Sequence, residues 1–331
     1  MKIRKTIIIL CSSLLLMSGC DGCKSKSSID EKKRENVNLN IIITPDLSNR
    51  VEANRYPKPV SDIALIRSVF DNYYPNLYEY NHRINGQKDA LNLAFTNANI
   101  ITEYKYKGLY SIDIAKKEDE NRLYLKTFDS TETQFHKESR SFVNDIEELY
   151  RKASIKPAGA DIISFFKNRI NTVLKKNINS KIKNYSIDTK FRNIIVLFTD
   201  GYIEAGLYGE RNCLENKCYF LDGYVINKFR KDFKKNGKGM DLKSFFYKKN
   251  YGIIPVKNKE LKNVEIFVCE LYDRSLNRRT GSRTVIPSDF DIMKIFWADW
   301  LEKSGFKKFK LVEKVSNVDE FQASFMSFLN E

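Results

Sequence analysis

Hydrophobic residues occur along this chain in three near-continuous runs and in several runs with helical spacing. The near-continuous runs are LNIIIT at 39–44, RNIIVLFT at 192–199 and NVEIFVCEL at 263–271. Their length and β-branched composition are typical of strands that are buried on both faces, as the strands of a parallel sheet are. Two weaker runs, 109–115 and 121–129, predict further strands.

Five other segments repeat apolar residues every three or four positions, which predicts amphipathic helices. They span residues 61–74, 138–153, 161–176, 288–305 and 317–330. Ser61 and Ser288 stand where N-caps are expected, and Gly305 stands where a helix should end. Strands that alternate with such helices predict an α/β fold, doubly wound, with a mostly parallel central sheet and helices on both faces.

Residues 1–19 have the pattern of a signal peptide and are set apart from the fold. Three cations precede an apolar core at 7–17, which is too short to span a bilayer as a helix. The core ends in LMSGC, which resembles the bacterial lipobox and implies acylation of Cys20, palmitate included. We therefore predict a lipoprotein of the bacterial cell envelope, anchored to the inner or the outer membrane. An ordinary secretory signal with an incidental cysteine is the alternative.

The chain is basic, but its charge is not concentrated. The formal net charge is +15, and removing the three cations of the signal peptide lowers it to +12. Lys and Arg are spread among many Asn residues without a run of five cations, which is typical of solvated faces. We therefore predict no nucleic-acid partner and a membrane contact made through the lipid.

The length that follows the signal peptide, about 310 residues, suits one large domain or two small ones. A polar tether is predicted at 20–37, and because no comparable linker follows, we predict a single domain over 38–331. Residues 202–262 exceed an ordinary connection. We interpret them as an insertion at the ligand-binding edge, with a peripheral subdomain that has no role in recognition as the alternative.

Cysteine use fits an oxidising compartment and does not favour zinc. Cys213 and Cys218 lie close together in CLENKC, and we predict that they form a disulfide. A zinc site is not expected, because C-x-x-C pairs are absent and the chain has only two histidines. Cys269 lies inside an apolar run and is interpreted as a small buried residue.

Acidic and hydroxyl side chains follow two of the predicted buried strands. Asp46 and Ser48 come after the first, and Thr199 and Asp200 come after the second. Ligands of open α/β sheets bind beyond the carboxyl ends of the strands, and oxygen atoms from separate loops suit a hard cation. With Asp161 from a third loop, the sequence predicts a site for Mg²⁺ formed by Asp46, Ser48, Asp161 and Asp200.

These motifs resemble the von Willebrand factor type A domain and its metal-ion-dependent adhesion site. That family places D-x-S-x-S after its first strand, a threonine in a later loop, and T-D-G after its fourth strand. The matching segments here are DLSNR at 46–50, AGADI at 158–162 and LFTDG at 197–201. The resemblance extends from about residue 39 to 331 through motif order. It implies a metal with an open position for a partner's carboxylate, and hence a protein-binding module and not an enzyme.

Two positions depart from the family pattern. Arg50 replaces the second serine, and Ala160 stands where the threonine would be, with Asp161 beside it. If Arg50 turned inward, we expect it to pair with Asp46 and Asp200 and to exclude the metal.

Two alternative functions remain open at this point. The first is a metal-free structural component of an envelope assembly. The second is a Mg²⁺-dependent phosphohydrolase, which the residues favour less, since position 48 is Ser where a D-x-D motif needs an acid and no G-x-x-x-x-G-K loop occurs.

Overall fold

Seven strands form one sheet in the order β10-β9-β5-β1-β2-β3, with β4 paired to β5 off this path. The structure is a computed structural model that describes residues 32–52, 54, 56–83, 87–114, 124–125, 132–182 and 185–331. The strands of the sheet are β1 (Lys32–Pro45), β2 (Ala90–Leu93), β3 (Ser111–Asp113), β4 (Ile178–Ile182), β5 (Tyr185–Phe198), β9 (Val264–Leu271) and β10 (Lys308–Glu313). β3 and β4 pair antiparallel and every other pairing is parallel. The predicted α/β class with a mostly parallel central sheet is confirmed.

The near-continuous apolar runs form strands because both faces of the sheet are covered. Ile41 and Ile43 of β1 contribute to the core on one face, and Ile42 contributes to the core on the other. Along β5, Val196 and Leu197 divide between the two cores in the same way. Successive side chains of a strand point to opposite faces, so a strand buried on both sides favours apolar residues at successive positions.

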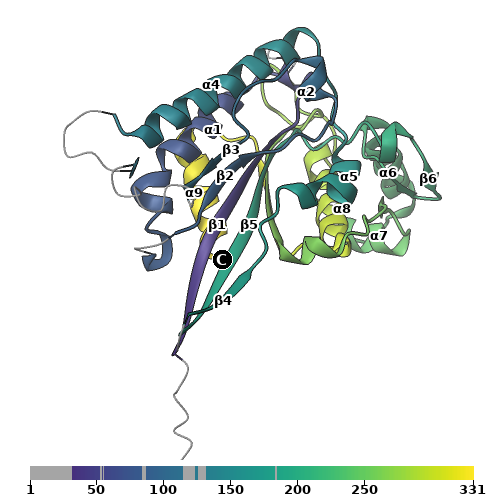
Figure 1. The fold of residues 1–331 in the computed structure, drawn as a ribbon. Coiled ribbons are helices and arrows are strands. Elements are labelled where there is room, and N and C mark those ends of the chain that lie inside the picture. The colour runs from purple at the N-terminus through teal and green to yellow at the C-terminus, as the bar shows by residue number, and fades with distance from the viewer. Residues whose placement is uncertain are drawn as a thin grey trace, which may run out of the picture.

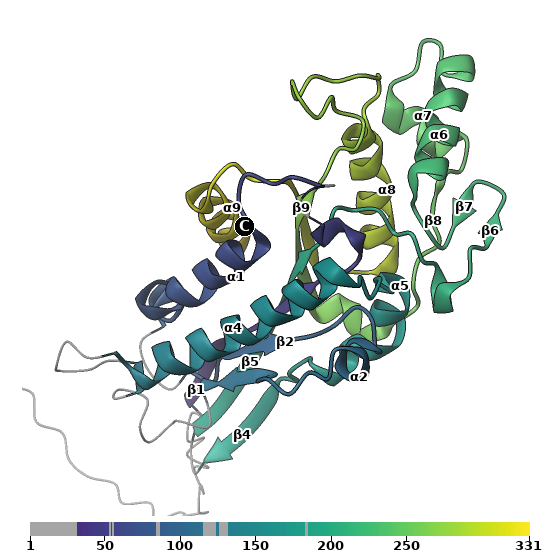
Figure 2. The same ribbon diagram turned by 90° about the horizontal axis from the view of Figure 1, so that it is seen from above.

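Helices cover each face of the sheet (Figures 1 and 2). α1 (Asp62–Asp71), α4 (Gln134–Ile155) and α9 (Val318–Asn330) supply one core. α5 (Ile162–Ser164) and α8 (Asp289–Ser304) supply the other. The remaining short helix is α2 (Ile100–Glu103), and the tighter or wider turns are η1 (Asn49–Val51), η2 (Tyr73–Leu77), η3 (Tyr80–His82), η5 (Phe165–Arg169), η6 (Ile170–Thr172), η7 (Leu207–Gly209) and η8 (Lys259–Asn263).

The predicted helix ends agree with the structure at three positions. The Ser61 side chain accepts a hydrogen bond from Ala64 N at 3.2 Å. Ser288 and Asp291 form a reciprocal capping box at the start of α8. Gly305 ends α8 with φ of 83°, a left-handed conformation that glycine adopts without strain.

Three asparagines, of which Asn40 and Asn193 are buried and Asn92 is partly buried, form a ladder across the middle of the sheet. Asn92 Nδ2 of β2 donates to Asn40 Oδ1 of β1 at 2.6 Å, and Asn40 Nδ2 donates to Asn193 Oδ1 of β5 at 2.7 Å. Asn193 Nδ2 donates in turn to Lys175 O at 3.0 Å. A one-residue slip of any of these strands would leave buried amides unpaired, so the ladder helps to fix the register.

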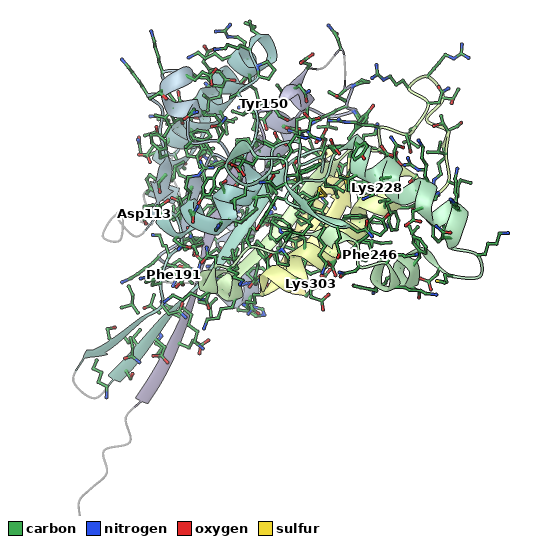
Figure 3. All side chains as sticks on the ribbon, turned by 90° about the vertical axis from the view of Figure 1, so that its right-hand side faces the viewer. Asp113, Tyr150, Phe191, Lys228, Phe246 and Lys303 are labelled. Carbon is green, nitrogen blue, oxygen red and sulfur yellow. A yellow bond between two sulfur atoms is a disulfide. The ribbon has the colours of Figure 1, made fainter. Side chains whose placement is uncertain are left out.

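Residues 202–262 form a unit of their own beside α8. It contains β6 (Cys213–Leu214), β7 (Lys217–Cys218), α6 (Gly223–Asn236), α7 (Leu242–Lys248) and β8 (Gly252–Ile253). Figure 3 shows Lys228 and Phe246 on this unit. Phe246 packs against Phe296 of α8 with ring centroids 4.9 Å apart. The predicted disulfide between Cys213 and Cys218 is confirmed, and it joins β6 to β7.

Other predicted segments differ from the structure or lie outside its description. β1 begins at Lys32, so its first residues fall inside the predicted tether. The helix predicted at 161–176 is wound partly as π and 3-10 turns and ends at Thr172, and the strand predicted at 121–129 lies mostly outside the described residues. The signal peptide and Cys20 also lie outside them.

Every helix in the described part of the chain is too short or too polar to cross a membrane.

Candidate functional site

Asp46 lies at the carboxyl end of β1 and joins the two motif loops. Its side chain is fully buried. Oδ1 accepts a hydrogen bond from Ser48 N at 2.9 Å, and Oδ2 accepts one from Thr199 Oγ1 at 2.8 Å. Asp46 N also donates to Phe198 O at 2.9 Å. The sheet therefore brings the D-x-S loop and the T-D-G loop into direct contact beyond β1 and β5.

The glycine of the T-D-G turn after β5 cannot be replaced without strain or a steric clash. Gly201 has φ of +86°, and a Cβ atom there would lie 2.1 Å from the sulfur of Met293. Trp297 Nε1 donates to Gly201 O at 2.8 Å, and Tyr202 N donates to Asp200 Oδ1 at 3.2 Å. Asp200, which is 2% exposed, is thus held in a fixed position beside Asp46.

Arg274 is the cation that pairs with Asp200. It is the third residue after β9, and its Nη2 donates to Asp200 Oδ2 at 2.6 Å. Its Nη1 donates to Glu204 Oε1 at 3.1 Å. The guanidinium lies 3.9 Å from the ring centroid of Tyr202. Burial alone would lower the pKa of Arg274, but the charge of Asp200 and the hydrogen bonds to Asp200 and Glu204 together outweigh burial and raise it. We call Asp46, Asp200, Glu204 and Arg274 the open cluster.

Arg50 does not bridge the two motif aspartates. Its Nη1 donates to Asp62 Oδ2 at 2.6 Å and its Nη2 donates to Asp62 Oδ1 at 3.3 Å. Its contact with Asp46 is made to the main-chain oxygen, at 3.2 Å. A planar guanidinium and a carboxylate fit each other through two parallel hydrogen bonds, and Asp62 in the first turn of α1 offers that arrangement.

Asp62 is the centre of a second group, in which Arg50, Asp62 and Glu270 are buried and Lys58 and Tyr150 are partly buried. Lys58 also contacts Asp62 and lies 3.6 Å from Glu270 Oε2, while Tyr150 Oη donates to Asp62 Oδ2 at 2.8 Å. Figure 3 labels Tyr150, which α4 contributes. We call Arg50, Lys58, Asp62, Tyr150 and Glu270 the closed cluster.

The two buried aspartates have opposite pKa shifts. Burial alone would raise the pKa of Asp62, but Arg50 and Lys58 outweigh it and hold that pKa well below its usual value. For Asp46, burial raises the pKa, the charge of Arg50 lowers it, and the charge of Asp200 raises it again. The net pKa of Asp46 is raised, because burial and the charge of Asp200 together outweigh the charge of Arg50 and the hydrogen bonds from Ser48.

Asp161 serves as a helix cap. Its Oδ1 accepts a hydrogen bond from Ser164 N at 3.0 Å, at the start of α5. Its loop does approach β1, since Ala158 N donates to Leu47 O at 3.2 Å. Within the described part of the chain, however, no recorded hydrogen bond or ion pair joins the Asp161 carboxylate to Asp46, Ser48 or Asp200.

The predicted metal ligands fit a divalent cation only in part. Asp46, Thr199 and Asp200 offer oxygen atoms at one place, as Mg²⁺ requires. The guanidinium of Arg274, however, already holds Asp200 Oδ2. Among the described residues, no three or more Asp, Glu, His or Cys side chains come together in a way that could hold a metal ion. The magnesium site stays a prediction, and the positive charge next to Asp200 in this structure is an arginine.

Sequence reasoning overlooked Arg274 and the closed cluster. Asp273 and Arg274 follow the third buried run as closely as Asp46 follows the first. The rule that ligands gather beyond the carboxyl ends of parallel strands would have identified them, had it been applied to all three runs.

Comparisons with known proteins add little. No protein-family model matches the chain, and no curated protein matches it. Among solved structures, the chain is similar to the pilus adhesin SpaC from Lactobacillus rhamnosus GG, with 10% sequence identity and a TM-score of 0.30. The match covers 89% of this chain and 30% of the adhesin, so the chain spans less than a third of that protein's length. A likeness at this level carries no argument about fold or function.

Proposed function

We propose that this protein is a lipid-anchored envelope protein whose von Willebrand factor A-like domain binds a protein partner at the carboxyl edge of its sheet. The strand order supports this proposal. When β4 and the inserted strands are set aside, the order β3-β2-β1-β5-β9-β10 is the 3-2-1-4-5-6 order of doubly wound sheets. The observation that carries the proposal is the hydrogen bond from Thr199 Oγ1 to Asp46 Oδ2, which joins the two motif loops at the switch point between β1 and β5.

The state of the two acids favours binding over catalysis. Both carboxylate oxygens of Asp46 accept hydrogen bonds, from Ser48 N and from Thr199 Oγ1. Asp200 is likewise engaged through both oxygens. Acids held in this way are fixed acceptors, whereas a general base or a nucleophile needs an oxygen free to reach the substrate. The edge therefore offers fixed charge for recognition.

The geometry of β1 suits a membrane anchor before it. β1 has 14 residues, which corresponds to about 45 Å, and it runs with β4 and β5 away from the helices (Figure 1). Its amino end is the end nearest to Cys20 in sequence. An anchor there leaves the carboxyl edge on the far side from the lipid, where a partner can reach it. Mass spectrometry of the mature amino terminus tests the acylation of Cys20.

Site-specific photo-crosslinking in intact cells tests partner binding. A photoreactive residue at Arg278, which is exposed and four residues beyond Arg274, should capture one protein. The same residue at Ile178, which is 55% exposed on β4 at the other end of the sheet, is the matched control. We expect a crosslinked species from position 278 that is absent from position 178. Equal capture from both positions, or capture from neither, would overturn the proposal.

A further inference from the structure

We infer that Arg274 supplies the positive charge through which this edge takes a carboxylate of its protein partner, at the place where the motifs predict a divalent cation. This inference deepens the proposed function and rests on it. Three sets of contacts made by the guanidinium support it. They are an ion pair with a buried acid on its inner side, contacts with two aromatic rings, and an ion pair with an exposed acid on its outer side.

The inner side of Arg274 is bound to a buried acid. Asp200 is 2% exposed, and its Oδ2 accepts from Arg274 Nη2 at 2.6 Å. A buried carboxylate is strongly destabilised without a cation or strong hydrogen bonds. In a metal-ion-dependent site, the metal would neutralise this acid. Here the guanidinium does so, and it needs no second component to be present.

Two aromatic rings lie against the guanidinium of Arg274. The ring centroid of Tyr202 lies 3.9 Å from the guanidinium carbon, and that of Tyr56 lies 4.8 Å from it. Tyr202 is itself fixed, because its hydroxyl donates to Asp289, which also pairs with Arg230. Stacking on aromatic rings stabilises a guanidinium and restricts its plane. Arg274 is therefore ordered before any partner arrives.

The outer side of the Arg274 guanidinium already pairs with a solvent-exposed carboxylate of the same chain, that of Glu204. Glu204 Oε1 accepts from Arg274 Nη1 at 3.1 Å, although the Glu204 side chain is 48% exposed. An exposed ion pair of this kind contributes little stability. A partner's Asp or Glu can thus replace Glu204 at little cost and form the forked pair that guanidinium and carboxylate favour. Glu204 shows the chemical class of the ligand.

Metal binding by variants tests whether the guanidinium stands at a cation site. Calorimetry with Mg²⁺ and Mn²⁺ should show no Asp200-dependent binding to the wild type. In Arg274→Gln, the acids lose their cation. We expect metal binding to this variant that is at least about tenfold tighter than any residual binding to the wild type. Adding Asp200→Asn to that variant should abolish the gain. Circular dichroism checks that each variant is folded.

Two results of the titration would overturn the inference. One is binding to the wild type that Asp200→Asn removes, because the edge would then hold a metal alongside Arg274. The other is a folded Arg274→Gln protein that gains no affinity for either metal, because the arginine would then not occupy a cation site.

Crosslinking from position 278 tests the role of Arg274 in recognition. Arg192→Gln is the matched control, because Arg192 also pairs with a buried acid, Glu265, and lies over a ring, Tyr80, but stands within β5, six residues before its carboxyl end. We expect the yield to resist chelation by EDTA, to fall at least about tenfold in Arg274→Gln and to persist in Arg192→Gln. A yield that EDTA removes and Mg²⁺ restores would overturn the inference. If the wild type captures nothing, the proposed function fails, while the metal titration still decides whether Arg274 stands at a cation site.

Discussion

The closed cluster and the open cluster are each built on an ion pair between an arginine and an aspartate, but they differ in what surrounds that pair. Both place an arginine on a buried aspartate: Arg50 on Asp62, and Arg274 on Asp200. The Arg50 side chain has no exposed surface, whereas the Arg274 side chain is 24% exposed. Every charge of the closed cluster is compensated by another member of that cluster. In the open cluster, one side of the guanidinium faces the solvent.

This difference indicates which arginine is structural and which is available to a ligand. Arg50 ties the loop after β1 to the first turn of α1, because it bonds both Asp62 and the main-chain oxygen of Asp46. Arg274 fixes Asp200 on one side and holds only the exposed Glu204 on the other. The residue that the family resemblance marks as abnormal, Arg50, is thus part of the scaffold beneath the site.

The largest expected effect is from Asp62→Asn in the closed cluster. The substitution leaves Arg50 and Lys58 buried without their common anion, which we expect to lower the free energy of unfolding by about 3–5 kcal/mol. Urea denaturation measures the change. Glu148→Gln, which removes an exposed partner of Arg151, is the control and should leave stability unchanged. A loss no greater than that of the control would contradict a structural role for the closed cluster.

A smaller loss is expected from Arg274→Gln in the open cluster. Asp200 loses its cation but keeps the hydrogen bond from Tyr202 N, and solvent can reach the vacated side. We expect the free energy of unfolding to fall by about 1–2 kcal/mol. The same denaturation experiment measures it. A loss as large as that of Asp62→Asn would mean that the two clusters do not differ in the way described.

The smallest effect is expected from Asp46→Asn, and its sign is opposite. Because the pKa of Asp46 is raised in the folded protein, its protonated form is favoured there, and the stability it contributes is lost as pH rises through that pKa. An asparagine can accept from Ser48 N and donate to Thr199 Oγ1, as the protonated acid would. Relative to the wild type, this variant should gain up to about 1 kcal/mol as pH rises above about 4.

The pH dependence of Asp62 is expected to run the other way. Its pKa is lowered in the folded protein, so its contribution is present above the unfolded value, near about 3.9, and is lost in stronger acid. Denaturation of the wild type and both variants between about pH 3 and 8 compares the two slopes. Parallel slopes for Asp46→Asn and Asp62→Asn, each taken against the wild type, would refute the assignment of opposite shifts.

The sequence alone determined the elements whose signal is local. The three near-continuous apolar runs became β1, β5 and β9, because a strand covered on both faces favours apolar residues at successive positions. The caps at Ser61 and Ser288 and the disulfide between Cys213 and Cys218 each depend on residues a few positions apart. Weak local signals failed: β2 (ALNL) has only four residues and none is β-branched, and the edge strand β10 is half-buried along its whole length.

The candidate site divides in the same way. The meeting of Asp46 with Thr199 could be predicted, since parallel strands place their carboxyl ends at one edge. Which arginine pairs with which acid could not. Asp200 and Arg274 are 74 residues apart, and Arg50 had Asp46, Asp62 and Asp200 as conceivable partners. An ion pair depends on side-chain direction and burial, and only the packing of α1 under the loop after β1 turned Arg50 to Asp62 and left Asp200 to Arg274.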